Sequence, residues 1–590
     1  MKGPAEMTEQ LATRRGLLKT SGALVVWFSL GAAFRAGGRG ALAQDAATPA
    51  PAATPVAVLE PGNIAIPENQ TEENVETHDV SGNAVDSWLA VAPDGTVTIF
   101  SGKVELGTGT ETAISQIVAE ELSVPFDRIT VIMGDTAQTP DQGYTSGSKT
   151  LQTSRPILQQ AGAVARQELF ARAAKQLGVA ADALVVKDGV ISVADDASKS
   201  VPYGDLVSDP FNEKVGTKAP LKPVSEYTVV GQPVERVDIP AKLFGIPIYI
   251  QDLRLDGMLH GRIVRPYVRH PDGIGTTVES IDESSVKDIP GVQVVRNGNF
   301  VGVVAEREEN AIRAAEQLKV TWSAQEPMLD EATLFDQILK MPVARDAVLQ
   351  GTGDVDKALK GAKNVVKARY EYPFQAHGSI GPSCAVADVK PDGATVYSST
   401  QGVYPLRGAL AQLLGLKAEQ VRVIYVEGAG CYGHNGFDDC AGDATLLSQA
   451  VKKPVRVQWM RQDEFAYELK GPAMVMQAQG ALDDKGNMLA WDYGVWTQTH
   501  STRPGNDAGN LLAGQLKDPP APVPNDGFVG GDRNGPHSYV FPNNRVTVHW
   551  LNMFGLRPSA LRSLGAMGNV FAVESFFDEM AAAAGADPVE

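Results

Sequence analysis

The chain has 590 residues, of which 43% are hydrophobic, and this length predicts several domains rather than one core. Its formal net charge of −18 at pH 7 argues against a nucleic-acid partner, because a phosphate backbone requires a basic protein face. The three cysteines, Cys384, Cys431 and Cys440, cannot supply the four ligands of an iron–sulfur cluster or a disulfide framework for so long a chain.

The first 43 residues have the features of an export signal. Arg14 and Arg15 precede a short apolar run, and a small-residue Ala-Leu-Ala motif ends at Ala43. This combination is typical of twin-arginine signals and predicts a periplasmic protein cleaved near Ala43. An N-terminal membrane anchor is the alternative, although the run is short for a bilayer span. Residues 44–85 are rich in Ala, Pro, Thr and Glu and are predicted to form a flexible linker.

The first predicted elements follow this linker. Residues 87–100 contain two alternating apolar runs around an Asp94–Gly95 turn, which predicts a pair of short strands. A Gly-Thr-Gly turn at 107–109 then leads into a helix predicted over 112–123, because apolar residues recur there at helical spacing.

Strands and helices alternate along the rest of the chain. Residues 244–266 are strand-like, and residues 299–323 predict a strand, a helix and a strand. A second glycine-rich turn, 428–436, precedes a helix predicted over 440–451. The chain ends in a predicted helix whose apolar residues fall largely on one face: Val570, Phe571, Val573, Phe577 and Met580.

The two glycine turns that lead into helices are candidate anion sites, because glycine allows close approach and unpaired N–H groups point at the ligand. Gly428, Gly430 and Gly433 follow a strand in the G-x-G-x-x-G pattern of dinucleotide-binding turns. A nicotinamide-binding unit also needs an acidic residue about 20 positions on for the ribose. No carboxylate occurs there, and the first turn would remain unexplained, so the nicotinamide interpretation is the less favoured one.

Several stretches, in a fixed order, resemble the molybdenum-binding large subunits of the xanthine dehydrogenase/aldehyde oxidase family. The likeness is greatest to the isoquinoline 1-oxidoreductase β-subunit and nicotinate dehydrogenase types. It covers roughly residues 86 to 590 and rests on segments such as GKVELGTGTETAISQIVAEEL, GMLHGRIVRP, STQGVYPLRGALAQLLG, EGAGCYGHNGFDDCAGDATLLS and RPSALRSLGAMGNVFAVESFFDEMA.

The resemblance implies an α+β fold that combines a small α/β hammerhead-like domain with molybdenum-cofactor-binding domains in permuted order. Residues 86–222 would be a permuted part of a cofactor-binding domain, and 223–330 the hammerhead domain. Residues 331–590 would form cofactor-binding domains, the second of them incomplete at its C-terminus.

The same resemblance implies molybdenum on a molybdopterin cytosine dinucleotide, with the metal held by the pterin rather than by side chains. Gln401 would hydrogen-bond an oxo ligand, and Arg562 would lie near the substrate carbon. Thr108 stands where many relatives carry glutamine. The implied pterin and phosphate contacts are Gly107, Thr108, Gly109, Thr145, Ser146, Gly147 and Ser148. The loop that would pass beside the metal is formed by Gly430, Cys431, Tyr432 and Gly433.

Structural alternatives exist for several of these residues. Gln401 could cap the following helix, and Arg562 could be an ordinary ion-paired arginine. His377 is predicted to support the turn at Gly378, and the Asp438–Asp439 pair to act through the charge of a helix N-terminus. Cys384 and Cys431 are predicted to be small packed residues rather than ligands.

The implied activity is hydroxylation of an electron-poor carbon with water as the oxygen source, on an N-heteroaromatic or an aldehyde. The implied partners are a small [2Fe–2S] subunit, because this chain cannot hold the clusters, and a cytochrome c acceptor. The loops "THSTRPGNDAGN" and "GPHSYVFPNNR" are candidates for shaping the substrate pocket.

The family's general-base glutamate, in a glycine-flanked motif, is not found. Glu574 and Glu590 do not sit in such a motif. The chain could be truncated, completed by a second chain, or non-catalytic, and truncation is the favoured interpretation. A cofactor-binding fragment without turnover is therefore the competing function.

Overall fold

The computed structural model describes residues 80–589 except 209–210, 212, 267–275, 324–328 and 525–526. Every described residue belongs to one compact unit, Leu59–Glu590. The predicted signal, its cleavage site and nearly all of the linker lie outside the described residues. Within the described part, no helix has both the length and the apolar character that crossing a membrane would require.

The N-terminal part of the described chain has its own core. The predicted pair of strands is confirmed as β1 (Leu89–Val91) antiparallel to β2 (Val97–Ser101), and β3 (Ile129–Met133) pairs in parallel with β2. The helix predicted over 112–123 is confirmed as α3 (Thr110–Leu122), which packs against the long α4 (Thr150–Leu177). A small antiparallel sheet follows, made of β4 (Leu184–Lys187), β5 (Val190–Val193) and β6 (Asp196–Pro202).

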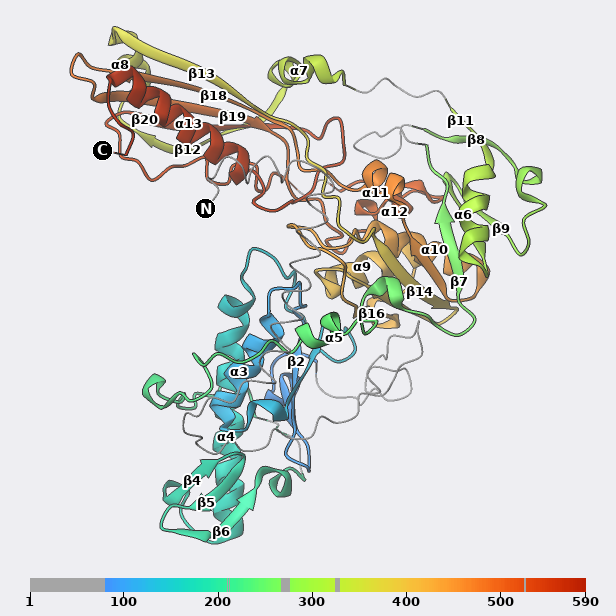
Figure 1. Ribbon diagram of the computed structural model, residues 1–590, viewed down its shortest axis with the longest axis vertical. Coiled ribbons are helices and arrows are strands. Elements are labelled where there is room, and N and C mark those ends of the chain that lie inside the picture. Colours follow the sequence, from blue (N-terminus) through green and yellow to red (C-terminus); the bar gives the residue numbers. More distant parts are fainter. Residues whose placement is uncertain are drawn as a thin grey trace, which may run out of the picture. The chain divides into compact units, whose positions relative to one another are not determined.

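A seven-stranded sheet forms the centre of the following part (Figure 1). Its order is β16 (Val421–Tyr425), β15 (Gly393–Ser398), β14 (Cys384–Lys390), β17 (Val455–Gln458), β7 (Leu259–Ile263), β10 (Phe300–Ala305) and β9 (Gln293–Asn297). Helices α9 (Val403–Leu414), α10 (Asp439–Val451) and α6 (Glu308–Gln317) pack against it, and β8 (Val278–Asp282) pairs with β11 (Lys319–Trp322) beside it.

This sheet joins segments that the sequence assigned to different domains. Strand β7 of the predicted hammerhead segment pairs in parallel with β17, with His260 opposite Arg456. The two segments therefore share hydrogen bonds across the boundary proposed at residue 330, while the domain limits themselves stay predictions. The strand-like prediction for 244–266 is correct only for β7. Residues 244–258 follow the short helix α5 (Ile239–Leu243) and form turns, among them a 3₁₀ turn at Ile250–Asp252.

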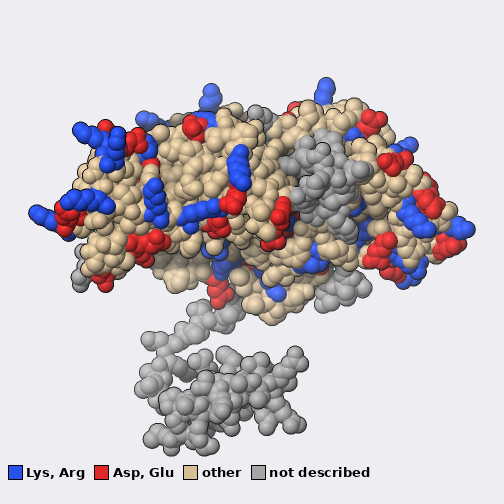
Figure 2. Space-filling model, turned by 90° about the horizontal axis from the view of Figure 1, so that it is seen from above, with Lys and Arg blue, Asp and Glu red and all other residues tan. Residues whose placement is uncertain are grey.

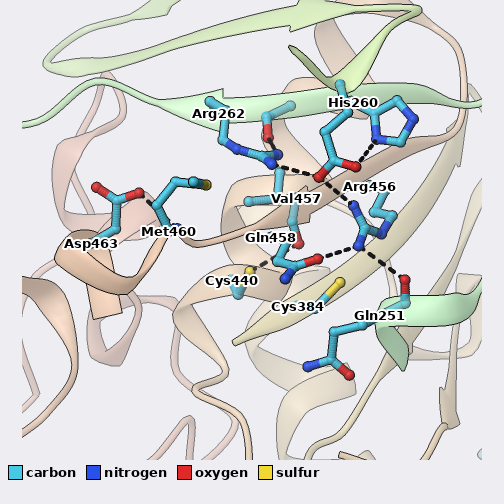
Figure 3. A network of polar contacts seen from close by, with 12 residues as sticks. Gln251, His260, Arg262, Cys384, Cys440, Arg456, Val457, Gln458, Met460 and Asp463 are labelled. Carbon is cyan, nitrogen blue, oxygen red and sulfur yellow. Dashed lines mark hydrogen bonds and ion pairs between the residues drawn. The ribbon is translucent and has the colours of Figure 1, made fainter. Parts of the chain in front are cut away.

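A shared carboxylate holds the junction of α6, β7 and β17 together (Figure 3). Glu308 Oε1 accepts a hydrogen bond from Arg262 Nη2 at 2.6 Å and another from Arg456 Nη1 at 3.0 Å. Both arginine side chains are only 3% exposed, whereas Glu308 is 33% exposed. Because buried charges are costly without a partner, Glu308 is central to this junction.

The last part of the described chain is a five-stranded sheet covered on one face by α13 (Ala566–Ala584), as Figure 1 shows. The strand order is β12 (Val343–Thr352), β20 (Asn544–Leu551), β19 (Met488–Thr497), β18 (Met474–Leu482) and β13 (Asn364–Tyr372). The remaining helices are short: α7 (Leu334–Lys340), α8 (Val355–Gly361), α11 (Arg461–Tyr467) and α12 (Leu512–Leu516). The mixture of helices and strands confirms the predicted α+β class.

The buried face of the C-terminal helix was partly mispredicted. Val573 and Met580 are buried as expected, but Val570 and Phe571 are 39% and 53% exposed. Phe576 is fully buried instead, with its ring 4.9 Å from that of Trp491 on the sheet. Apolar spacing located the helix, but its rotation about its axis was decided by contact with the sheet.

Charged side chains on the surface are of both signs. On the face shown in Figure 2, lysines and arginines are interspersed with aspartates and glutamates.

Candidate cofactor-binding site

Three segments that are distant in sequence meet at the side chain of Gln401, which is 4% exposed. Its Nε2 donates to the carbonyl oxygen of Thr145 at 2.9 Å, and the Thr145 N–H donates back to the Gln401 carbonyl at 2.7 Å. Its Oε1 accepts from the N–H of Asn435 at 2.8 Å. Helix α9 has no side-chain cap, so the alternative role of Gln401 as a cap is not observed.

Arg503 completes this junction, and the sequence did not single it out. Its Nη1 donates to Gln401 Oε1 and its Nη2 to the carbonyl of Gly433, each at 3.0 Å. Its guanidinium lies over the ring of Tyr144, 5.5 Å from the centroid. Burial lowers the pKa of Arg503, and the nearby Asp438 opposes that shift. The signal available in sequence was its place in a loop predicted to shape the substrate pocket.

The second glycine turn requires its glycines because of close packing. Gly430 and Gly433 have φ of +148° and +95°. A Cβ at Gly433 would lie 1.9 Å from the backbone nitrogen of Arg562, whose N–H donates to the Tyr432 carbonyl at 2.7 Å. The structure thus brings the predicted residues Tyr432, Gly433 and Arg562 together by backbone contact. Cys431 beside them is half-buried, and burial raises the pKa of its thiol.

The side chain of Arg562 is exposed, and it has no ion-pair or hydrogen-bond partner among the described residues. The alternative of an ordinary ion-paired arginine is therefore not observed. The two residues after it, Ser563 and Leu564, have left-handed φ of 79° and 54°, a conformation that costs free energy for non-glycine residues. The backbone is thus constrained where Arg562 meets the glycine turn.

His377 has a different role from the one predicted. The N–H groups of His377 and Gly378 donate to the Glu468 carboxylate at 2.9 and 3.1 Å, so Glu468 holds that turn. The imidazole Nε2 instead accepts the N–H of Tyr432 at 3.1 Å and anchors the glycine turn. His377, Glu464 and Glu468 place ligand-type atoms within 4.8 Å of one another. Lys470 Nζ donates to Glu468 at 2.8 Å, which favours a structural role for this group.

The first glycine turn differs from the prediction in one important respect. The N–H groups of Thr108, Gly109 and Glu111 all donate to the carboxylate of Glu105, which is 4% exposed. These three backbone donors are therefore satisfied within the chain and do not remain open for a phosphate. Gly107 and Thr108 are exposed, and a Cβ added at Gly107 would have no neighbouring atom within 4 Å.

The turn before α4 is exposed, and its helix N-terminus has no side-chain cap. Ser146, Gly147 and Ser148 are exposed, and Gly147 and Ser148 have left-handed φ of 63° and 57°. No side chain caps the N-terminus of this 28-residue helix. Since Thr145 is the residue bonded to Gln401, an anion at this helix end would lie next to the Gln401 junction.

The two glycine turns lie close together in the fold. The Tyr425 hydroxyl, just before the second turn, donates to the carbonyl of Glu105 just before the first. Lys242 Nζ bridges Asp238 at 2.7 Å and Glu427 at 2.6 Å. The two turns are therefore neighbours in the fold, and Gly107 and Thr108 are the exposed part of the first one.

These features define a class: an α+β protein in which a glycine turn, the loop before a long helix and a buried glutamine meet at one junction. Two family models, each described as a molybdopterin cofactor-binding domain, match residues 67–240 and 340–511. The chain belongs to the xanthine dehydrogenase family of molybdopterin-binding oxidoreductase subunits, as its motifs predicted.

Curated relatives agree with this family. A nicotinate dehydrogenase subunit of Pseudomonas putida is 40% identical over 511 residues, which cover 85% of this chain and 42% of that protein. The isoquinoline 1-oxidoreductase β-subunit of Brevundimonas diminuta is 25% identical over 603 residues, 90% of this chain and 72% of that protein. The chain thus spans less than half the length of the nicotinate dehydrogenase subunit.

Among solved structures, the aldehyde oxidoreductase from Desulfovibrio gigas is similar with a TM-score of 0.47 and 21% identity. The match covers 59% of this chain and 41% of that one.

Proposed function

We propose that this chain is the molybdenum-cofactor-binding part of a hydroxylase that inserts water-derived oxygen at an electron-poor carbon of an N-heteroaromatic compound. The observation that carries the proposal is the convergence of Thr145, Gln401 and Gly433 at one buried junction. The 40% identity to a nicotinate dehydrogenase subunit supports the substrate class. Oxidation of an aldehyde is the alternative.

The residues present fit such a cofactor. The Gln401 amide carries two N–H groups, of which one is bonded to Thr145, so the second is available for an oxygen ligand. The α4 N-terminus offers backbone donors for a phosphate group, and the cytosine dinucleotide form proposed here would place its phosphates there. When bound, the molybdenum centre would supply the two-electron oxidation and the oxygen to be transferred.

The chain's own residues would bind and orient. Gln401 would donate a hydrogen bond to the cofactor, and the exposed guanidinium of Arg562 would attract an anionic or electron-rich group of the substrate. The glycine turn, held by His377 and Arg562, would fix one wall of the site. A general base is not assigned among the described residues.

The proposal extends to partners and location. Electrons would pass to a small [2Fe–2S] subunit, with a cytochrome c as further acceptor, and the protein would be exported to the periplasm through the twin-arginine signal at its N-terminus. These statements rest on the sequence expectations and on the family.

Metal and pterin analysis tests the proposal. The full chain, produced in a bacterium that makes the cytosine dinucleotide, should contain molybdenum, pterin and CMP released on acid hydrolysis in equal amounts. Oxidation of nicotinate, isoquinoline and aromatic aldehydes by the chain with its partners then assigns the substrate class. Absence of both metal and pterin would refute the proposal, and cofactor without turnover would support the competing role of a cofactor-binding fragment.

A further inference from the structure

We propose that Arg503 is a positioning residue that fixes the orientation of the Gln401 amide and thereby keeps one Gln401 N–H available to the cofactor. This inference rests on the proposed function for its catalytic consequence, but the contact between the two side chains can be tested without the cofactor.

The hydrogen bonds of the Gln401 amide define its orientation. Gln401 Oε1 accepts from Arg503 Nη1 at 3.0 Å and from the Asn435 N–H at 2.8 Å, while Nε2 donates to the Thr145 carbonyl at 2.9 Å. A half-turn of the amide would place its NH₂ group against two donors and its oxygen against a carbonyl oxygen. All three contacts would then be repulsive, so one orientation is strongly preferred.

Arg503 contributes the charged member of this set. A hydrogen bond from a guanidinium to a neutral amide oxygen is stronger than one from a backbone N–H. It also polarises the amide, which makes the remaining N–H a better donor. The Asn435 N–H alone would hold the same orientation less firmly, because it is a single neutral donor.

The same guanidinium also fixes the glycine turn. Arg503 Nη2 donates to the Gly433 carbonyl at 3.0 Å, so one planar group sets the distance between Gln401 and the turn. Asp438, Tyr144 and Cys431 favour the charged form of Arg503, while Arg503 disfavours the protonated forms of His377 and His434. Asp438 is 4% exposed and its Oδ1 has no hydrogen-bond partner among the described residues, so its carboxyl is placed near Arg503 without a direct bond. A lysine could reach one of the two oxygens but not both in this geometry.

A purely structural role for Arg503 makes a different prediction. If Arg503 only braced the glycine turn, its removal would lower stability and cofactor content, and it would do so whether or not Gln401 were present. If it acts through Gln401, its effect should largely disappear once the Gln401 amide has been removed.

The test is a double-mutant cycle with R503M, Q401L and the double variant, together with R503K. In the cofactor-free full chain, the loss in Tm of the double variant should be clearly smaller than the sum of the two single losses. In the loaded enzyme, R503M should lower kcat per bound molybdenum by about 10- to 100-fold with KM changed less than about twofold. In the Q401L background it should lower kcat no further.

R172M is the matched control. Arg172 also donates to a backbone carbonyl, that of Leu206 at 3.0 Å, and lies over an aromatic ring, that of Phe211 at 5.1 Å. Its contacts lie away from Gln401, so R172M should lower Tm while kcat per molybdenum stays at the wild-type value.

Additive Tm losses, or an equal fall in kcat with and without Gln401, would overturn the inference. R503K, which keeps the charge, should recover part of the kcat, and it provides the same comparison if R503M does not fold. If the wild-type chain held no molybdenum, the proposed function would fail, whereas the Tm cycle would still decide whether Arg503 and Gln401 are coupled.

Discussion

Replacing Glu308 by glutamine tests how the two segments of the seven-stranded sheet are held together. The substitution keeps the shape of the side chain but removes the negative charge that Arg262 and Arg456 share (Figure 3). Both guanidiniums are almost fully buried, so the variant leaves two positive charges in a poorly solvated junction. Breaking a buried ion pair on one side is strongly destabilising for this reason.

The magnitude follows from the acidity of Glu308. Burial acts to raise the pKa of this carboxyl, but Arg456 and Arg262 outweigh burial and lower it from 4.5 to about 2. A difference of about 2.5 pKa units corresponds to about 3.4 kcal/mol. Because one third of the side chain is exposed, solvent screening reduces this figure, and we expect a loss of about 2–3 kcal/mol at pH 7.

The pH dependence gives a second measurement. A carboxyl whose pKa is lower in the folded state stabilises the protein above its unfolded pKa, and this contribution is lost as the pH falls through the folded value. The difference between wild type and Glu308→Gln should therefore be constant above about pH 5 and shrink between pH 4.5 and 2. Urea denaturation followed by circular dichroism at several pH values measures it.

The neighbouring residue provides a matched control. Glu309 pairs with Arg307, but the two side chains are 60% and 75% exposed, so Glu309→Gln should leave the denaturation midpoint almost unchanged. Equal losses for the two variants, or a Glu308→Gln effect independent of pH, would refute the buried-pair reasoning.

Three further predictions concern the cofactor turns. Glu105→Gln should lower the free energy of unfolding by about 1–3 kcal/mol, because the first turn loses its charged acceptor, and an unchanged urea midpoint would contradict this. Gly433→Ala should lower Tm and molybdenum content far more than Gly107→Ala. Both positions have positive φ, but only the Cβ added at Gly433 would meet backbone, since it would lie 1.9 Å from the nitrogen of Arg562. Glu111→Gln should stabilise the chain by up to about 3 kcal/mol at pH 8 and hardly at pH 4.5. Burial, together with nearby carboxylates, raises the pKa of Glu111 to about 7, so its charged form opposes folding, and Tm against pH checks the sign.

Local features of the sequence were sufficient to locate many of the elements. Helices α3 and α10 lie within a few residues of their predicted limits, because apolar spacing and glycine turns are properties of neighbouring residues. The order of the motifs also identified the family, which the two molybdopterin-binding matches confirm. The signal peptide, the domain limits and the individual site roles stay predictions.

The sequence by itself therefore determined the α+β class and the family, and it indicated the segments that we propose surround the cofactor. Only the tertiary structure decided that Arg503 reaches Gln401 across 102 positions, that Glu105 satisfies the first turn, and that β7 and β17 share one sheet. Hydrogen-bond partners and burial depend on which distant segments pack together. The identities and spacing of neighbouring residues encode local conformation, but they do not specify which distant groups will satisfy a buried donor or acceptor.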